Sequence, residues 1–244
     1  MKNKSKNSVK EVIVQKIKAI VNFVKNPDNK LSRSYDIKKN LKSVLTFYLI
    51  KLFFLSLWII VMILFLDFEP APVVEIRNKM SPLSFLLYAL LLGPILEEAI
   101  FRLSLVFKPW YITISVLLLT YVLTSKLVYG IGHLNIEDHL LVRILISILF
   151  ALITYFFANK YLNYFLKFWN VNFRWIYYCS IIFFALLHLN LLELTFNKFL
   201  LFPLLTFPQL LGGTINGYIR IKYGFIYSCL FHGINNILPA ISVL

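Results

Sequence analysis

The chain has 244 residues, of which 59% are hydrophobic and only 15% are charged. Soluble domains are closer to half apolar, with about a quarter of their residues charged. A membrane-spanning helix needs roughly 20 apolar residues, and the apolar residues here come in several blocks of that length. The composition therefore excludes an ordinary soluble domain and predicts an all-α fold, a polytopic transmembrane helical bundle.

The net charge of +14 is concentrated at the N-terminus. Residues 1–43 hold twelve of the 25 Lys and Arg against three acidic residues, a local net charge of +9. Nucleic-acid binding is one interpretation of such a tail, but in front of a membrane domain the positive-inside rule and attraction to anionic lipids explain it better. We expect a cytoplasmic segment that binds anionic lipids and no nucleic acid. Apolar residues at helical intervals in 10–25 predict an interfacial amphipathic helix.

Seven apolar blocks are predicted to span the membrane, and residues 160–174 leave room for a short or re-entrant helix, so that the count is seven or eight. The seven blocks cover about 44–66, 83–107, 110–129, 140–159, 175–193, 199–219 and 224–243.

The connections between these blocks predict the orientation. With the N-terminus in the cytoplasm, the inside connections carry Lys108, Lys160, Lys167, Arg174, Arg220 and Lys222. The outside connections, 67–82 and 130–139, carry most of the acidic loop residues, as the positive-inside rule requires. The connection between the fifth and sixth blocks holds Glu193 and Lys198. We expect a multi-pass protein of a plasma membrane, and the compact size and lack of a targeting peptide fit a bacterial one.

The sequence GPILEEAIFR, residues 93–102, places three ionisable groups inside an apolar block. An ionisable residue within a span is costly and is a functional hypothesis by default. Lys51, Lys126 and Arg143 lie near predicted span ends, where a long side chain reaches the interface. No such explanation applies to the remaining polar residues of the spans: Glu97, Glu98, Arg102, His188, His232, Asn235 and Asn236.

Helix geometry divides the two glutamates. Glu98 and Arg102 are four residues apart with the acid first, which is the favoured order for an ion pair. Glu97 lies about 100° around the helix from Glu98 and has Phe101 at the position where a partner would stand. We therefore expect one paired carboxylate and one that is available for proton transfer. The alternative is that all three charges only form a polar network between helices.

Four polar residues share a depth in the predicted bundle. At the helical rise per residue, Glu97 and His188 lie about 15 and 20 Å from the inside ends of their spans, and His232 and Asn236 about 12 and 18 Å. A carboxylate and an imidazole can together activate a water, while a second imidazole and an amide can stabilise an oxyanion or hold a metal. This set is typical of a hydrolase, with or without a metal.

Three motifs carry a resemblance to a known family. They are EExxxR at 97–102, FxxxH from Phe184 to His188, and HxxxN from His232 to Asn236, in this order and in separate predicted spans. The chain resembles the CPBP family of intramembrane proteases, also called the Abi or CAAX-processing family. The resemblance covers about 82–240. It leaves 44–81 as a first span with its outer loop, and 1–43 as the basic segment.

The resemblance implies a CAAX-type intramembrane endopeptidase acting on a membrane-associated peptide or protein. Carried over, Glu97 is the base, His188 its partner, and His232 and Asn236 the stabilising residues. Glu98, Arg102 and Phe184 would be supporting residues. The family is commonly described as metalloproteases, which implies a divalent metal such as zinc, with His188 and His232 as its ligands.

Two other classes of function stay open. The same fold can serve as a non-catalytic membrane scaffold or as a bacteriocin self-immunity protein. A bis-histidine haem or ion-translocating protein is a further alternative, although it leaves the paired glutamates unexplained. In the 130–139 loop, His133 and His139 with Glu137 and Asp138 admit a surface metal site, but a solvated loop is the simpler interpretation.

Overall fold

The structure, a computed structural model, describes residues 9–31, 36–66, 80–188 and 200–242 and contains no strand in these ranges. The all-α prediction is confirmed for this part of the chain. Its α-helices are α1 (Val9–Lys25), α2 (Ile37–Leu66), α4 (Pro82–Leu87), α5 (Gly93–Phe101), α6 (Pro109–Leu123), α7 (Leu140–Lys160), α8 (Leu162–Val171), α9 (Phe173–Leu187), α11 (Phe202–Leu205), α12 (Phe207–Lys222) and α13 (Phe225–Ile241). Two π-helical turns, η1 (Tyr88–Leu92) and η3 (Thr124–Val128), and a 3₁₀ turn, η2 (Leu103–Leu105), extend three of them.

Four helical stretches are long and apolar enough to cross a membrane: Ile37–Leu64, Pro82–Leu105, Pro109–Val128 and Leu140–Lys160. Helices α8 and α9 together make a fifth candidate, bent by 79° at their junction. Helix α13 is apolar but has only 17 residues. The predicted count of seven or eight spans is therefore not confirmed, and the short helix expected in 160–174 is α8.

The sixth predicted span differs most from its prediction. Residues 199–219 were expected to form one apolar helix, but α12 has only 16 residues and buries a face that includes Asn216 and Arg220. This helix is packed inside the bundle rather than exposed along its length. The outer loop predicted at 67–82, up to residue 79, and the connection with Glu193 and Lys198 lie outside the described residues.

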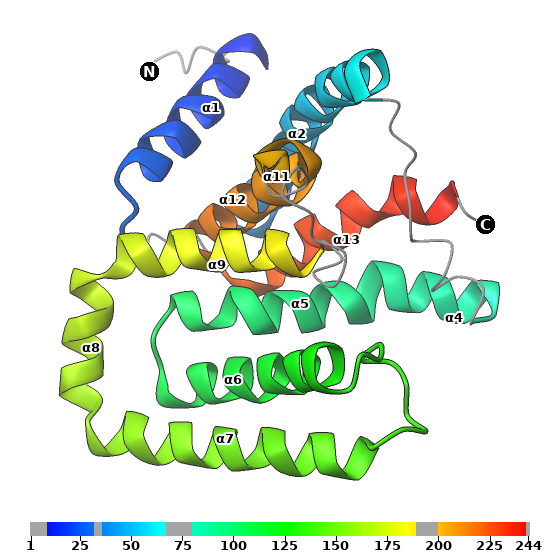
Figure 1. Cartoon of the computed structure of the whole chain (residues 1–244). Helices are drawn as coiled ribbons and strands as arrows, with labels where there is room; N and C mark the ends of the chain where they lie inside the picture. The colour runs from blue at the N-terminus through cyan, green and yellow to red at the C-terminus, as the bar shows by residue number, and fades with distance from the viewer. Residues whose placement is uncertain (1–8, 32–35, 67–79, 189–199, 243–244) are drawn as a thin grey trace.

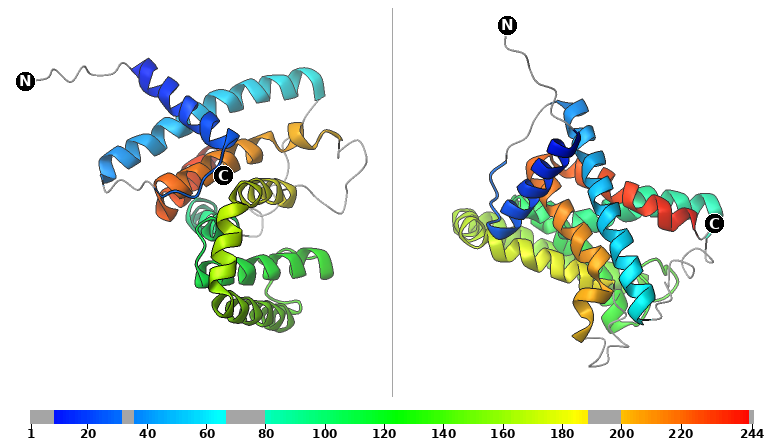
Figure 2. Two further views of the ribbon diagram at one scale, coloured as in Figure 1. Left: turned by 90° about the vertical axis from the view of Figure 1, so that its left-hand side faces the viewer. Right: turned by 90° about the horizontal axis from the view of Figure 1, so that it is seen from above.

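The helices form two groups that meet along α5 and α9 (Figure 1). Helices α5, α6 and α7 lie side by side, and α8 crosses one end of this layer to bring the chain back along α9 (Figure 1). On the other side, α12 packs against α9, α13 and α2, and α13 also contacts α5 and η1. Two further views show α2 and α12 crossing the layer on that side (Figure 2).

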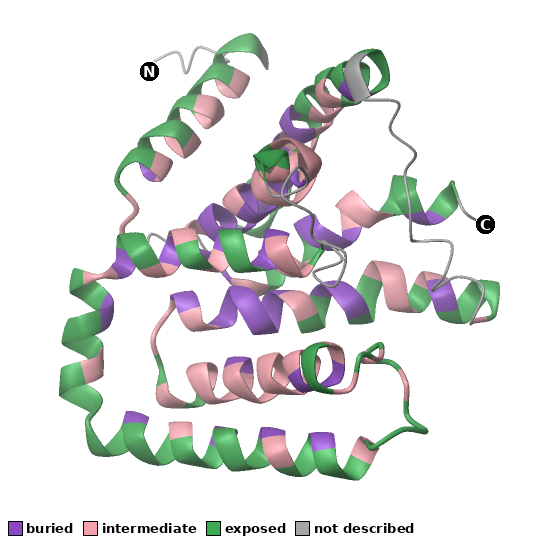
Figure 3. Cartoon of the chain, in the orientation of Figure 1, coloured by how far each residue is buried: buried purple, intermediate pink, exposed green. Residues whose placement is uncertain are grey.

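Large apolar side chains remain exposed along the outer helices. Helix α7 and much of α2 are exposed over most of their length (Figure 3). The exposed side chains include Ile63 and Leu64 on α2 and Leu149, Leu152 and Phe156 on α7. Apolar patches of this extent mark a surface that contacts lipid or another apolar partner, which agrees with the candidate spans.

The N-terminal segment contributes to the core. Helix α1 forms within the predicted 10–25 stretch, and its Phe23 is buried with ring centroids 5.2 Å from both Tyr177 and Tyr218. Lys16 donates to Ser43 Oγ and to the Tyr223 hydroxyl, both at 2.8 Å. The inner face of α1 therefore packs on α2, α9 and α12, a contact that the prediction of an interfacial amphipathic helix did not include.

Glycines allow the central helices to approach closely. A Cβ on Gly217 would lie 2.6 Å from the ring of Tyr177, and one on Gly213 would lie 2.8 Å from a nitrogen of Arg102. A Cβ on Gly233 would lie 2.5 Å from the carbonyl oxygen of Leu90. Small residues at helix contacts are the usual means of close packing between membrane helices. They bring α12 and α13 against the helices that carry the ionisable residues.

Candidate active site

Three helices bring together the unpaired glutamate and both motif histidines. Glu97 lies on α5, His188 caps the C-terminus of α9, and His232 lies on α13. Glu97 Oε2 is 3.7 Å from His188 Nε2 and 3.6 Å from His232 Nε2. About a third of the side-chain surface of Glu97 and of His188 is exposed, while His232 is 9% exposed. The cluster is thus open on one side.

The second nitrogen of each imidazole determines what the first can do. His188 Nδ1 lies 2.8 Å from the carbonyl oxygen of Phe184. A carbonyl only accepts, so Nδ1 carries the hydrogen and the neutral ring presents a lone pair at Nε2. His232 Nδ1 lies 2.9 Å from Glu98 Oε1, and an ionised carboxylate there imposes the same tautomer.

The cluster therefore has a surplus of acceptors. Two Nε2 lone pairs and Glu97 Oε2 face one another, and Glu97 Oε2 is a buried atom with no hydrogen-bond partner in the described part of the chain. Buried acceptors need a donor. A water molecule, with two O–H groups, matches this need: it can donate to the carboxylate and to one imidazole at once.

Glu98 lies on the buried side of the site and orients the groups around it. Its side chain is fully buried, and Oε1 accepts from His232 Nδ1 at 2.9 Å and from Asn216 Nδ2 at 3.0 Å. Arg102, also fully buried, places NH1 3.6 Å from the same oxygen, so the ion pair expected from the four-residue spacing is present. Glu98 thereby fixes the orientation of His232, which is how carboxylates commonly position catalytic imidazoles.

Phe184 packs against Arg102 and the two histidines. Its ring packs edge-on against His188 and His232, with centroids 4.5 and 5.9 Å apart. The guanidinium of Arg102 lies 4.0 Å from the centroid of the same ring, a cation–π distance. The Phe184 ring thus contacts His188, His232 and Arg102.

Asn236 has a different immediate partner from the one expected. It follows His232 by one helical turn, and its Nδ2 donates to the carbonyl oxygen of Ala89 in the π-helical turn η1 at 2.8 Å. Within the described residues its side chain makes no bond to Glu97 or either histidine. The contact ties α13 to η1 and leaves the second N–H of the amide for another acceptor.

Asn216 was missed by the sequence analysis. It is buried on α12 and supplies one of the two hydrogen bonds to Glu98. The signal was available, because an amide within a predicted apolar span is costly unless it is paired. The glycines beside it, which permit close packing, are a second indication.

Two cations predicted at the interface are buried instead. Lys51 is 8% exposed, with Nζ 6.0 Å from the centroid of the Phe231 ring. Arg143 is fully buried and donates to Ser125 Oγ at 3.0 Å and to the carbonyl oxygen of Asn135. Neither side chain reaches outward as predicted, because bundle packing covers the helix face that carries it.

The predicted divalent metal at His188 and His232 stays a prediction. Glu97 and the two histidines are ligand types that zinc binds, but no three His, Cys, Asp or Glu side chains in the described ranges form a group that could hold a metal ion. In the 130–139 loop, His133 Nε2 lies 2.9 Å from the Tyr88 hydroxyl, and the His139 ring stacks on the ring of Tyr129. Burial lowers the pKa of His133.

Comparison of the chain with protein-family models, curated proteins and solved structures found no match. The resemblance to the CPBP family therefore rests on the three motifs alone. What the site can do must be argued from its own residues.

Proposed function

We propose that the chain is an intramembrane endopeptidase that hydrolyses a peptide bond of a membrane-associated peptide or protein. The observation that carries the proposal is the position of Glu97 Oε2, within 4 Å of two imidazole Nε2 atoms and without a hydrogen-bond donor among the residues that the structure describes. A carboxylate in that position is a general base for a water. The order and identity of the three motifs agree with this chemistry.

The proposed reaction uses the acceptors in turn. A water donates one O–H to Glu97 Oε2 and the other to His188 Nε2. Glu97 takes the first proton as the hydroxide oxygen attacks the carbonyl carbon of the substrate. The second N–H of Asn236 donates to the oxyanion. His232 adds a second donor once its Nε2 has taken up a proton from solvent, and it keeps that proton through the cycle. Glu97 then passes its proton to the leaving amine, the C–N bond breaks, and the base is regenerated.

The proposed setting is a membrane that the chain crosses several times. The four or five candidate spans and the exposed apolar faces of α2 and α7 support it. A count of seven would need the bent pair α8–α9, α12 and α13 all to cross as well. The positive-inside rule then places the basic N-terminus in the cytoplasm, in a plasma membrane of bacterial type. The partners are the peptide substrate and anionic lipids.

The decisive variant is Glu97→Gln, which keeps the size of the side chain and removes the base. We expect the rate of cleavage to fall by about 10²- to 10⁴-fold, the usual contribution of a general base. Because the substrate is unidentified, the readout is a comparison of membrane-associated peptides from cells with wild-type or variant protein. The matched control, Glu137→Gln, changes an exposed glutamate of the 130–139 loop and should leave the peptides unchanged.

The scaffold or self-immunity alternative predicts a different result. If Glu97→Gln and His188→Ala leave every peptide processed and any protective effect intact, the protein acts by binding and the proposal fails. The haem alternative gives no role to Glu97, although Glu97 Oε2 lies 3.7 and 3.6 Å from the two Nε2 atoms that would bind the iron.

A further inference from the structure

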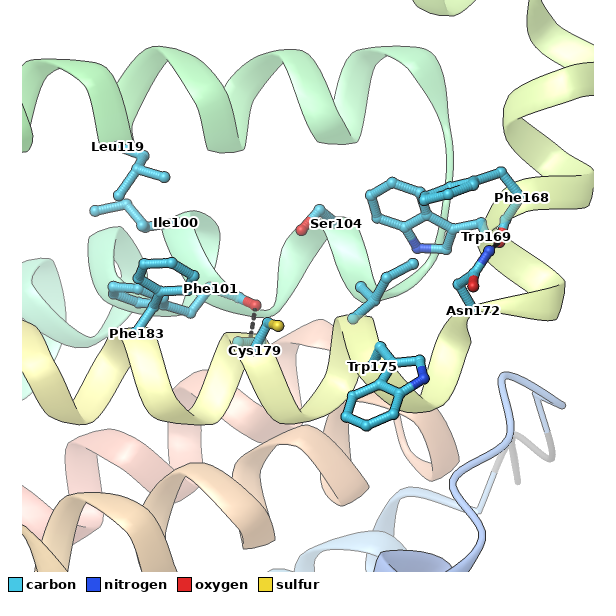
Figure 4. A pocket seen from close by; sticks show the side chains of 12 residues that line it. Ile100, Phe101, Ser104, Leu119, Phe168, Trp169, Asn172, Trp175, Cys179 and Phe183 are labelled. Atoms are coloured by element: carbon cyan, nitrogen blue, oxygen red, sulfur yellow. Dashed lines mark hydrogen bonds between the residues drawn. The ribbon is translucent and has the colours of Figure 1, made fainter. Parts of the chain in front are cut away.

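A pocket that contains none of the catalytic residues lies along α5 and α9, beyond Phe101 from the catalytic cluster. A pocket of about 520 Å³ opens between α5, α6, α8 and α9 (Figure 4). Its walls are mainly apolar, with Ile100, Leu119, Phe168 and Phe183 among them. The ring of Phe101 also lines it, and that ring packs on Phe184, which in turn covers His188. The volume is in the range of small-molecule sites.

One buried donor in this pocket has no acceptor. Trp169 is 9% exposed, lines the pocket, and its Nε1 makes no hydrogen bond within the described residues. Figure 4 shows its indole turned to the pocket interior. An indole N–H only donates, and a buried donor without a partner is costly. The pocket therefore suits an apolar occupant that carries an acceptor oxygen near Trp169.

The junction of α8 and α9 places this donor beside a cationic surface. The two helices meet at 79°, so α8 lies along the membrane surface if α9 crosses it. Lys167 and Arg174 are exposed on either side of this junction, and residues 140–188 contain no Asp or Glu. Tryptophan is enriched at this level of a bilayer. The charge of the junction is complementary to an anionic headgroup.

We propose that the pocket binds one acyl chain of an anionic phospholipid. The chain lies among the apolar walls, an ester carbonyl oxygen accepts from Trp169 Nε1, and the phosphate lies over Lys167 and Arg174. A peptide segment fits less well, because the pocket offers too few polar partners for its backbone groups. The inference rests on the proposed membrane location and not on the proposed hydrolysis.

The test uses tryptophan quenching by brominated lipids. The variant Trp58→Phe/Trp110→Phe/Trp175→Phe leaves Trp169 as the single tryptophan of the chain. The purified protein in detergent is titrated with phosphatidylglycerol or phosphatidylcholine carrying dibrominated acyl chains. We expect both lipids to quench Trp169 saturably. The concentration that gives half-maximal quenching should be lower for the anionic lipid, by about fivefold for each cation that contacts the phosphate.

Two kinds of variant separate the pocket from the surrounding lipid. Cys179→Phe fills the pocket from a lining residue of α9 and should abolish the saturable quenching. Ser104→Leu does the same from the α5 side if the first variant fails to fold. Lys167→Gln/Arg174→Gln should keep the quenching and remove the preference for the anionic lipid.

Any of four results would overturn the inference, and the first three are no saturable quenching, quenching that survives both pocket-filling variants, and equal potency of the two lipids. Equal quenching by a brominated fatty acid would assign the pocket to a lipid chain without the headgroup and would also overturn it. No readout involves peptide cleavage. Failure here and failure of the proposed hydrolysis are therefore distinguishable.

Discussion

Replacing Arg102 by methionine tests whether Glu98 is the ion-paired carboxylate, which leaves Glu97 as the available one. Arg102 and Glu98 are both fully buried, with NH1 and Oε1 3.6 Å apart. Removing one partner of a buried ion pair leaves an uncompensated charge, which typically costs about 3–5 kcal/mol of unfolding free energy. Methionine keeps much of the apolar contact that the arginine makes with Phe184, so the loss reports the charge and not a cavity.

The remaining contacts of Glu98 set the size of the effect. Its Oε1 still accepts from His232 Nδ1 and Asn216 Nδ2, and hydrogen bonds to a charged group contribute about 1.5–3 kcal/mol each. We therefore expect a loss near the lower end, about 3 kcal/mol. The double variant Glu98→Gln/Arg102→Met has no unpaired charge and should be more stable than Arg102→Met alone.

The assay is reversible unfolding of the purified protein in mixed micelles with increasing SDS, followed by pulse proteolysis. Lys38→Met, at an exposed lysine, is the control and should change stability by no more than about 0.5 kcal/mol. If Arg102→Met costs less than about 1 kcal/mol, or if the double variant is the less stable of the two, then Arg102 does not compensate a charged Glu98. The assignment of Glu97 as the one available base would then lose its structural argument.

Three further predictions use the same unfolding assay or hydrogen exchange. Gly217→Ala places a Cβ 2.6 Å from Tyr177 and should cost about 1–3 kcal/mol by overpacking; an unchanged stability would show that α12 can shift. Lys126→Met removes the 2.8 Å hydrogen bond to the Leu187 carbonyl and should lower the unfolding free energy by about 1.5–3 kcal/mol. Amide hydrogen exchange at the end of α9 should increase in this variant, and Lys126→Arg should restore the protection. Burial lowers the pKa of His133 below 6.5, so the stability that the neutral His133 contributes is present above pH 6.5 and is lost as the pH falls through its folded-state pKa. The protection of residues 129–139, taken relative to the intrinsic exchange rate at each pH, should therefore fall on acidification, and His133→Gln should remove that dependence.

Local patterns in the sequence account for much of the site. The four-residue spacing of Glu98 and Arg102 predicts an ion pair because residues at that spacing share a helix face, and the pair is present. The depths of Glu97, His188 and His232 were estimated from helical rise alone, and the structure places these three side chains together. Both inferences need only regular helices and a common bilayer frame.

The sequence patterns do not predict how each helix is rotated about its axis or where two helices pack closely. Asn216 and Lys51 turn inward because bundle packing covers the faces that carry them. Asn236 donates to Ala89 because a π-helical turn precedes α5, and a π-turn leaves no clear trace in hydropathy. The bend between α8 and α9, and the short length of α12, likewise reduced the number of candidate spans.

The sequence by itself determined that the chain is helical and apolar. It also determined which polar residues are energetically unfavourable inside an apolar span, and that Glu98 has a cation, Arg102, on the same helix face. These properties follow from composition and from contacts within a few residues. Only the tertiary structure decided that two imidazole lone pairs face Glu97, that Asn216 completes the environment of Glu98, and that Trp169 lines a pocket. The reason is that each of these contacts joins side chains from different helices, whose rotation about their axes is set by glycine contacts and packing across the whole bundle.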